Sequence, residues 1–364
     1  MIEAHSPGKL YIAGEYAVLE PGEPAILIAV DRYLSVRLTE STDRGRVFST
    51  EYGHLPMVWR LSHHTGRVIP EHHPYDYVAA AINTVEQVRA ARKLTPRYFD
   101  LRIESQLDDE NGQKFGLGSS GAVVTATIDA LNQFYDLGLS AAERFQLALL
   151  ATIHLSPKAS GGDLAASTFG GWISYRAPSR ERLREVLDND GVVAALDPEL
   201  WRGCRVDPLP NPAAFELYVG WTGSPASTDA LVDQVQHRPQ ETSLSYGEFV
   251  AASRDIVERL TDSLHRGEAH VTLQAVREAR SLLRALGETS GLNIETEKLA
   301  QLCNIAETNN AAAKPSGAGG GDCGIAFVSD ESNAHDLLSQ WDQHHIHRLS
   351  LRVHPGEGKG VDFG

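Results

Sequence analysis

Residues 114–121 read Lys-Phe-Gly-Leu-Gly-Ser-Ser-Gly, which brings three glycines and two hydroxyls together within six positions. An apolar run over residues 122–131 follows directly and has the character of a helix. The backbone N–H groups of the loop would then converge at a helix N-terminus, where the helix dipole favours an anion. This pattern predicts the binding of phosphate groups.

Other structures also fit a loop of this composition. The Gly-x-Gly-x-x-Gly pattern occurs in dinucleotide sites, but such a site needs a strand leading straight into the glycines and an acidic-ended strand after the helix. Here a polar turn at residues 108–112 precedes the loop, and a second helical stretch follows the first. A Walker loop is excluded because no Gly-Lys-Ser/Thr closes the segment. The plain alternative is a Gly-Ser linker in which Ser119 or Ser120 caps an ordinary helix.

Two further segments combine lysine with glycine. Gly8 and Lys9 lie at the head of an apolar strand, and Lys314 precedes a run of glycines at residues 317–321. A chance linker explains one such segment more easily than three, each beside a core element. Together the three segments favour a phosphorylated ligand that is held from several sides.

The composition limits the class of protein. With 364 residues the chain is long enough for two domains, and its hydrophobic (42%) and charged (22%) fractions are those of a globular protein. A formal net charge of -15 argues against nucleic-acid partners and gives no attraction to an anionic membrane. We see no membrane-spanning run and no signal peptide, and three widely spaced cysteines fit reduced thiols, so a cytoplasmic protein with small-molecule partners is expected.

Hydrophobic periodicity predicts the elements that must position these loops. Strands are expected at residues 6–16, 24–38, 98–107, 169–175, 215–221, 324–328 and 347–353, and helices at 77–92, 122–131, 141–154, 294–309 and 334–341. Residues 229–286 are expected to form long helical stretches that are broken near residues 238–239 and 265–267. Residues 43–74 are expected to form loops with at most one edge strand, and the Gly-rich tail after Pro355 is expected to fray. The charged stretch 181–212 is predicted to connect an N-terminal domain (1–180), which carries the phosphate loop, to a C-terminal domain (213–364).

The three lysine and glycine segments resemble, in order and spacing, the three motifs of the GHMP kinase superfamily. The matching stretches are residues 7–15, 116–121 and 314–322, so the resemblance spans nearly the whole chain. Residues 14–22, 114–121 and 316–324 look most like those of its bacterial phosphomevalonate kinase branch. The resemblance implies a two-domain α+β fold, with an N-terminal S5-like domain and a C-terminal ferredoxin-like domain, in which ATP and an acceptor meet between the domains.

By this resemblance, the second motif would hold the phosphates of ATP, and the hydroxyls of Ser119 or Ser120 would reach Mg²⁺. The cofactor-binding residues are then Gly116, Leu117, Gly118, Ser119, Ser120 and Gly121. Phosphoryl transfer depends on positioning and on neutralising charge that spreads over the equatorial oxygens. Lys9 is the first choice for the cation at the transferring group, and Lys114 would supply a second positive charge.

Residues 160–165 resemble the segment that carries an active-site aspartate in this family, which makes Asp163 the candidate base. A phosphomonoester is largely dianionic at neutral pH, because its second pKa is near ~6. A phosphate acceptor therefore needs little deprotonation, and Asp163 is expected to position groups more than to remove a proton. The acceptor is expected to contact Lys9, Tyr16, Ser160, Ser227, Ser316, Gly317 and Ala318.

The implied reaction is the ATP-dependent phosphorylation of (R)-5-phosphomevalonate to 5-diphosphomevalonate with release of ADP, in the mevalonate route to isoprenoids, by a monomer or homodimer. A mevalonate kinase or another small-molecule kinase of the superfamily would share every loop. A diphosphomevalonate decarboxylase would share the fold, and a non-catalytic regulatory relative would be favoured if Lys9 or Asp163 were missing. A serine hydrolase using Ser119 and Ser120 lacks a recognisable basic partner.

Overall fold

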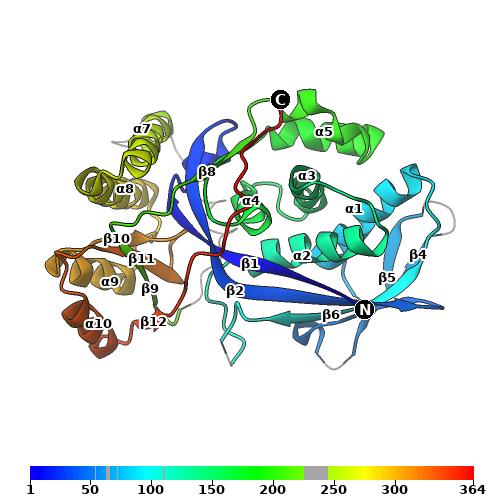
Figure 1. The fold of residues 1–364 in the computed structure, drawn as a ribbon, viewed down its shortest axis with the longest axis horizontal. Coiled ribbons are helices and arrows are strands. Elements are labelled where there is room, and N and C mark those ends of the chain that lie inside the picture. The colour runs from blue at the N-terminus through cyan, green and yellow to red at the C-terminus, as the bar shows by residue number, and fades with distance from the viewer. Residues whose placement is uncertain (54, 63–65, 72, 110, 225–244) are drawn as a thin grey trace.

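The structure is a computed structural model that describes residues 1–364 except 54, 63–65, 72, 110 and 225–244. Two β-sheets organise the described residues, one with nine strands and one with four (Figure 1). Among these same residues, no helix is long and apolar enough to cross a membrane.

The nine-stranded sheet is built around the long strand β2. Its strands are β1 (Ile2–Ala13), β2 (Pro24–Ser41), β3 (Gly45–Phe48), β4 (Met57–Leu61), β5 (Val68–Glu71), β6 (Tyr98–Ser105), β7 (Trp172–Arg176), β8 (Arg205–Leu209) and β13 (Val361–Asp362). Their order is β13-β8-β7-β2-β6-β3-β4-β5, and β1 pairs with β2 in antiparallel register. Residues 24–30 of β2 are buried throughout, and burial alternates over residues 34–38, as the pattern predicts.

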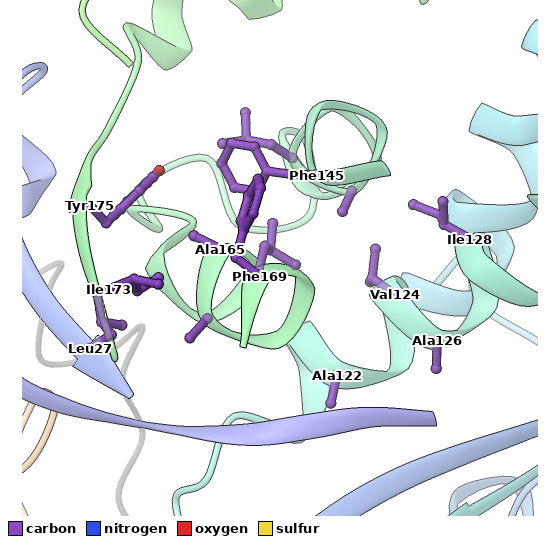
Figure 2. Close-up of a cluster of buried hydrophobic side chains, with 14 of the residues drawn as sticks. Leu27, Ala122, Val124, Ala126, Ile128, Phe145, Ala165, Phe169, Ile173 and Tyr175 are labelled. Atoms are coloured by element: carbon purple, nitrogen blue, oxygen red, sulfur yellow. The ribbon is translucent and has the colours of Figure 1, made fainter. Parts of the chain in front are cut away.

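Helices cover this sheet and hold the ends of two loops in place. They are α1 (Tyr77–Ala91), α2 (Ser119–Phe134), α3 (Ala141–Thr152), α4 (Gly162–Phe169) and α5 (Arg180–Asp190). Both α2 and α4 pack on β1 and β2, while α1 and α3 pack on α2. Figure 2 shows Phe145 of α3 and Phe169 of α4 in one buried cluster with Ile173 and Tyr175 of β7. Because the cluster is densely packed, the first turns of α2 and α4 are fixed relative to β1.

The second sheet carries the third loop. It has the order β10-β11-β9-β12, with β9 (Glu216–Trp221), β10 (Ala312–Pro315), β11 (Cys323–Val328) and β12 (His347–Leu349) all paired antiparallel. Its helices are α7 (Tyr246–Arg266), α8 (Ala269–Ser290), α9 (Glu297–Thr308) and α10 (Ala334–Gln343). Short 3-10 turns occur at Ala17–Leu19, Thr50–Tyr52, Ala194–Leu196 and Pro198–Trp201. Both α8 and α9 pack on β10, so the loop between β10 and β11 projects from a packed base.

Two predictions of irregular structure are wrong. Residues 43–74 contain three strands, β3 to β5, which are only four or five residues long and therefore too short for a clear period. The C-terminal tail is also ordered, since β13 pairs with β8 and the Phe363 side chain is 7% exposed. The Phe363 ring lies 5.5 Å from that of Phe145 and 5.9 Å from that of Trp201, between ring centroids. Packing of one aromatic residue thus anchors a Gly-rich segment.

The stretch 181–212 also has regular structure. It contains most of α5 and the whole of β8, and β8 pairs with β7 in the nine-stranded sheet. The limits 1–180, 181–212 and 213–364 stay a prediction for the domains.

Candidate active site

The three predicted loops line one pocket of about 320 Å³. Thirteen predicted site residues face this pocket, namely Lys9, Tyr16, Lys114, Gly116, Leu117, Gly118, Ser119, Ser120, Ser160, Asp163, Ser316, Gly317 and Ala318. Gly121 lies behind them in α2, and Ser227 lies outside the described residues. The pocket brings together β1 of the first sheet and the loop between β10 and β11 of the second, from positions more than 300 residues apart.

The second loop presents the start of α2 to the pocket. The helix begins at Ser119, and its N-cap is Gly118, whose φ of 82° is favourable only for glycine. Neither serine is the cap, so the simple helix-capping alternative for their hydroxyls is wrong. The first N–H groups of a helix have no partner within the helix. The loop therefore offers backbone donors and two hydroxyls at the positive end of the α2 dipole.

Lys9 lies between the second and third loops. Its backbone N–H donates to the carbonyl of Leu117 at 2.8 Å, and its Nζ donates to the carbonyl of Gly116 at 3.1 Å. A Cβ added to Gly118 would lie 3.0 Å from Lys9 Cγ, and one added to Gly317 would lie 3.8 Å from Lys9 Nζ. The ammonium group is thus held by β1 at the place where both loops meet.

Asp163 approaches the same place from the first turn of α4. A Cβ on Gly121 would lie 2.4 Å from Asp163 Oδ2, so glycine is needed for α2 to pass this carboxylate. Burial raises the pKa of Asp163 above its ordinary value, while Lys9, the backbone N–H of Leu164 and Arg180 act in the opposite direction. Two cations from separate elements, Lys9 and Arg180, therefore favour the ionised form of this carboxylate.

The other two lysines of the sequence pattern have different environments. The Lys114 side chain is 53% exposed at the edge of the pocket, and its Nζ lies 3.3 Å from Glu51 Oε1. Lys314 is fully buried, and its ammonium pairs with Glu15, which also accepts the backbone N–H of Gly317 at 3.3 Å. Lys314 therefore joins the first and third motifs and does not line the pocket.

Hydroxyl groups connect β1, α4 and the third loop along the pocket wall. The Tyr16 hydroxyl donates to the carbonyl of Ala318 at 2.6 Å. Ser316 Oγ accepts the backbone N–H of Tyr11 and donates to the carbonyl of Tyr11, both at 2.9 Å. The hydroxyls of Tyr11 and Ser160 are 2.8 Å apart. These bonds fix the distance between β1, α4 and the third loop.

Tyr11, Tyr77 and Ser156 are among the pocket-lining residues that the predicted site does not include. A signal existed for Tyr11, because it follows Lys9 by two positions on β1 and so points to the same face. The Lys9 ammonium lies 5.6 Å from the centre of the Tyr11 ring. The hydroxyls of Tyr77 and Ser156 are 2.5 Å apart, although 79 positions separate the residues. No local pattern indicates that pair.

The donor set also decides how a divalent cation would be held. Within the described part of the chain, no group of three or more His, Cys, Asp and Glu side chains could form a metal cage. The hydroxyls of Ser119 and Ser120 at the pocket wall are hard oxygen ligands. Mg²⁺ keeps several waters and binds through one or two protein oxygens together with substrate phosphates, so these two residues fit it.

Comparison with known proteins places the geometry in context. The family model "GHMP kinases N terminal domain" matches residues 76–171, and the model "GHMP kinases C terminal" matches residues 269–347. The chain is 45% identical to the phosphomevalonate kinase of Streptomyces sp. (strain CL190), over 91% of each chain. It is 28% identical to the mevalonate kinase of Pyrococcus abyssi, over 90% of this chain and 89% of that one.

A solved structure shows the same architecture. The phosphomevalonate kinase of Streptococcus pneumoniae, in complex with phosphomevalonate and AMPPNP, superposes with a TM-score of 0.85 at 29% identity. The match covers 97% of this chain and all of that one. The predicted two-domain fold with mixed α and β content is confirmed by these likenesses.

Proposed function

This chain belongs to the GHMP kinase superfamily, and we propose that it transfers the γ-phosphoryl group of ATP to the phosphate of (R)-5-phosphomevalonate. The products are 5-diphosphomevalonate and ADP. The observation that carries the proposal is the convergence of Lys9, Asp163 and the start of α2 on one pocket, opposite the third loop.

The triphosphate end of the site is the second loop. The free N–H groups at the start of α2 would bind ATP phosphate oxygens, and Lys114 at the pocket edge would add a positive charge. Ser119 and Ser120 would hold Mg²⁺, which when bound neutralises charge on the β- and γ-phosphate oxygens. The hydrogen bond between Lys9 and Leu117 anchors the loop to β1, so these donors would be preorganised for ATP.

The transfer needs no proton from the acceptor. An oxygen of the dianionic acceptor phosphate forms a bond to the γ-phosphorus, the bond from that phosphorus to the β,γ-bridging oxygen breaks, and ADP leaves with the bonding electron pair. The Lys9 ammonium would stabilise negative charge on the equatorial oxygens as they pass through the transition state. Asp163 would orient Lys9 and the acceptor.

The rest of the acceptor would lie toward the third loop. Tyr16, Ser160, Ser316, Gly317 and Ala318 line that side, and we place the acceptor carboxylate and hydroxyl among them. Because Tyr16 and Ser316 are already hydrogen-bonded to backbone groups, they would shape this end of the pocket by holding the loops together. Ser227 remains a proposed contact outside the described residues.

A coupled assay of ADP release tests the proposal. Purified protein with Mg-ATP is offered mevalonate, phosphomevalonate, diphosphomevalonate, homoserine and galactose in separate reactions. We expect turnover with phosphomevalonate alone. Turnover with mevalonate in its place would indicate a mevalonate kinase, and activity with none of the five would favour a regulatory relative.

A further inference from the structure

One half-buried arginine near the pocket has incomplete hydrogen bonding. Arg180 is the first residue of α5, and its Nη2 donates to the carbonyl of Ser156 at 2.9 Å. Its Nε and Nη1 are buried, and neither has a hydrogen-bond partner within the part of the chain that the structure describes. No acidic side chain of that part lies within 4.0 Å of the guanidinium either. The group is thus a buried charge with two unused donors.

Such an arrangement is unfavourable for stability. A buried donor without a partner lowers stability, and the loss is larger when the group is charged. Burial lowers the pKa of Arg180 because it disfavours the charged form. Tyr175, Asp163 and Tyr77 act in the opposite direction. A methionine would fill similar space without this penalty. The charge itself therefore needs a functional explanation.

The surroundings of Arg180 lead directly to the pocket. Its hydrogen-bond partner Ser156 and its neighbour Tyr77 share a hydroxyl contact of 2.5 Å, and both residues line the pocket. Tyr175 donates its hydroxyl to the carbonyl of Ser160, which lines the pocket as well. Arg180 thus lies behind the wall that runs from Tyr77 to Asp163 and does not form its surface.

The groups that face Asp163 come from several elements. Lys9 on β1 and Arg180 on α5 attract its carboxylate, and the phenols of Tyr11 on β1 and Tyr175 on β7 lie within electrostatic range. During transfer, a dianionic acceptor and the γ-phosphate would join this carboxylate, so negative charge would accumulate around Lys9. A second cation behind the wall would offset part of that repulsion.

We propose that Arg180 is a positioning residue for phosphoryl transfer. Its buried positive charge holds the Asp163 carboxylate and the wall formed by Tyr77 and Ser156 in place beside the dianionic acceptor. The role rests on the proposed function, and it acts through these groups because the guanidinium itself does not line the pocket.

Two substitutions separate the charge from the packing. Arg180→Met removes the charge but keeps the volume, and Arg180→Lys restores a charge. We expect kcat with phosphomevalonate to fall on the order of tenfold or more in Arg180→Met, with KM for ATP within about twofold and a melting temperature equal to or above that of the wild type. Arg180→Lys is expected to recover most of the lost turnover. Arg182→Met, at an exposed position of the same helix, is the matched control and should behave as the wild type.

Chemical rescue tests the same role without relying on how well the side chain of Arg180→Lys packs. In Arg180→Ala, added guanidinium at non-denaturing concentration is expected to raise kcat, whereas neutral urea of similar shape is not. Equal turnover of Arg180→Met and wild type would overturn the role of Arg180 and leave the proposed function standing. A parallel loss of kcat and of melting temperature, without recovery by lysine or guanidinium, would also overturn it. Absence of wild-type turnover with phosphomevalonate would overturn the function itself.

Discussion

The contact between Gly121 and Asp163 gives a sharp test of the site geometry. In Gly121→Ala, the new Cβ would lie 2.4 Å from Asp163 Oδ2 and 2.8 Å from its Cγ. Carbon atoms in favourable contact are about 3.5–4.0 Å apart, so the carboxylate must move by roughly 1 Å. The nearest atoms belong to the end of a side chain, so Asp163 can turn away while α2 stays in place.

The expected effects on activity and on stability therefore differ. A misplacement of about 1 Å at a reacting centre can lower the rate about 10²-fold, which corresponds to about 2.7 kcal/mol in the barrier. Overpacking lowers the free energy of unfolding by about 1–3 kcal/mol, and the better helix propensity of alanine raises it by up to about 1 kcal/mol. The melting temperature should therefore fall by only a few degrees while kcat falls by about two orders of magnitude.

Steady-state ADP release and thermal unfolding measured on the same preparations decide the matter. Gly247→Ala is the matched control, because Gly247 lies in the first turns of α7 with no atom within 4 Å of an added Cβ. It should keep wild-type turnover. A Gly121→Ala protein that retains turnover within about threefold would refute the placement of Asp163 beside the reacting groups.

Three further predictions concern charge and packing. Steady-state kinetics on phosphomevalonate should show a larger loss of turnover for Lys9→Ala, about 10³-fold, than for Asp163→Asn, about tenfold, since the acceptor is already ionised; the reverse ranking would contradict this role for Asp163. Lys314→Met should lower the free energy of unfolding by about 3–5 kcal/mol in urea titrations because it leaves the buried Glu15 carboxylate unpaired. A double variant that also replaces Glu15 with Met should recover part of the lost stability. Phe363→Ala should cost about 3–5 kcal/mol by the same titration because the ring packs in the core of the first sheet, and a cost near zero would mean that the tail frays.

Much of the fold follows from local patterns in the chain. Residues 77–92 were expected to form a helix from their 3.6-residue period, and α1 spans Tyr77–Ala91. The strands β2 and β9 were readable from their continuous apolar runs. The strands β3 to β5 were not, because alternation over four or five residues cannot be told from chance.

Some residues of the candidate site carry a local sequence signal, and others do not. Gly116 and Gly118 were readable because glycines at left-handed positions leave a pattern in the chain. Lys9 was readable because it stands beside Gly8 at the head of an apolar strand. The order of the tail was not readable, since it depends on Phe363 meeting Phe145 across more than 200 residues. Arg180 and the pair formed by Tyr77 and Ser156 reach the pocket only through tertiary packing, and a lone arginine or tyrosine carries no local signal of that kind. The roles of the individual site residues stay predictions until variants are measured.

The phosphorus NMR spectrum of the reaction product tests the central claim most directly. Transfer to the phosphate of phosphomevalonate creates a P–O–P linkage, so the purified product should show two coupled phosphorus doublets. The signal of the acceptor monoester should disappear as ADP accumulates. A new uncoupled monoester resonance, with the original phosphate signal intact, would show transfer to a hydroxyl and would contradict the account.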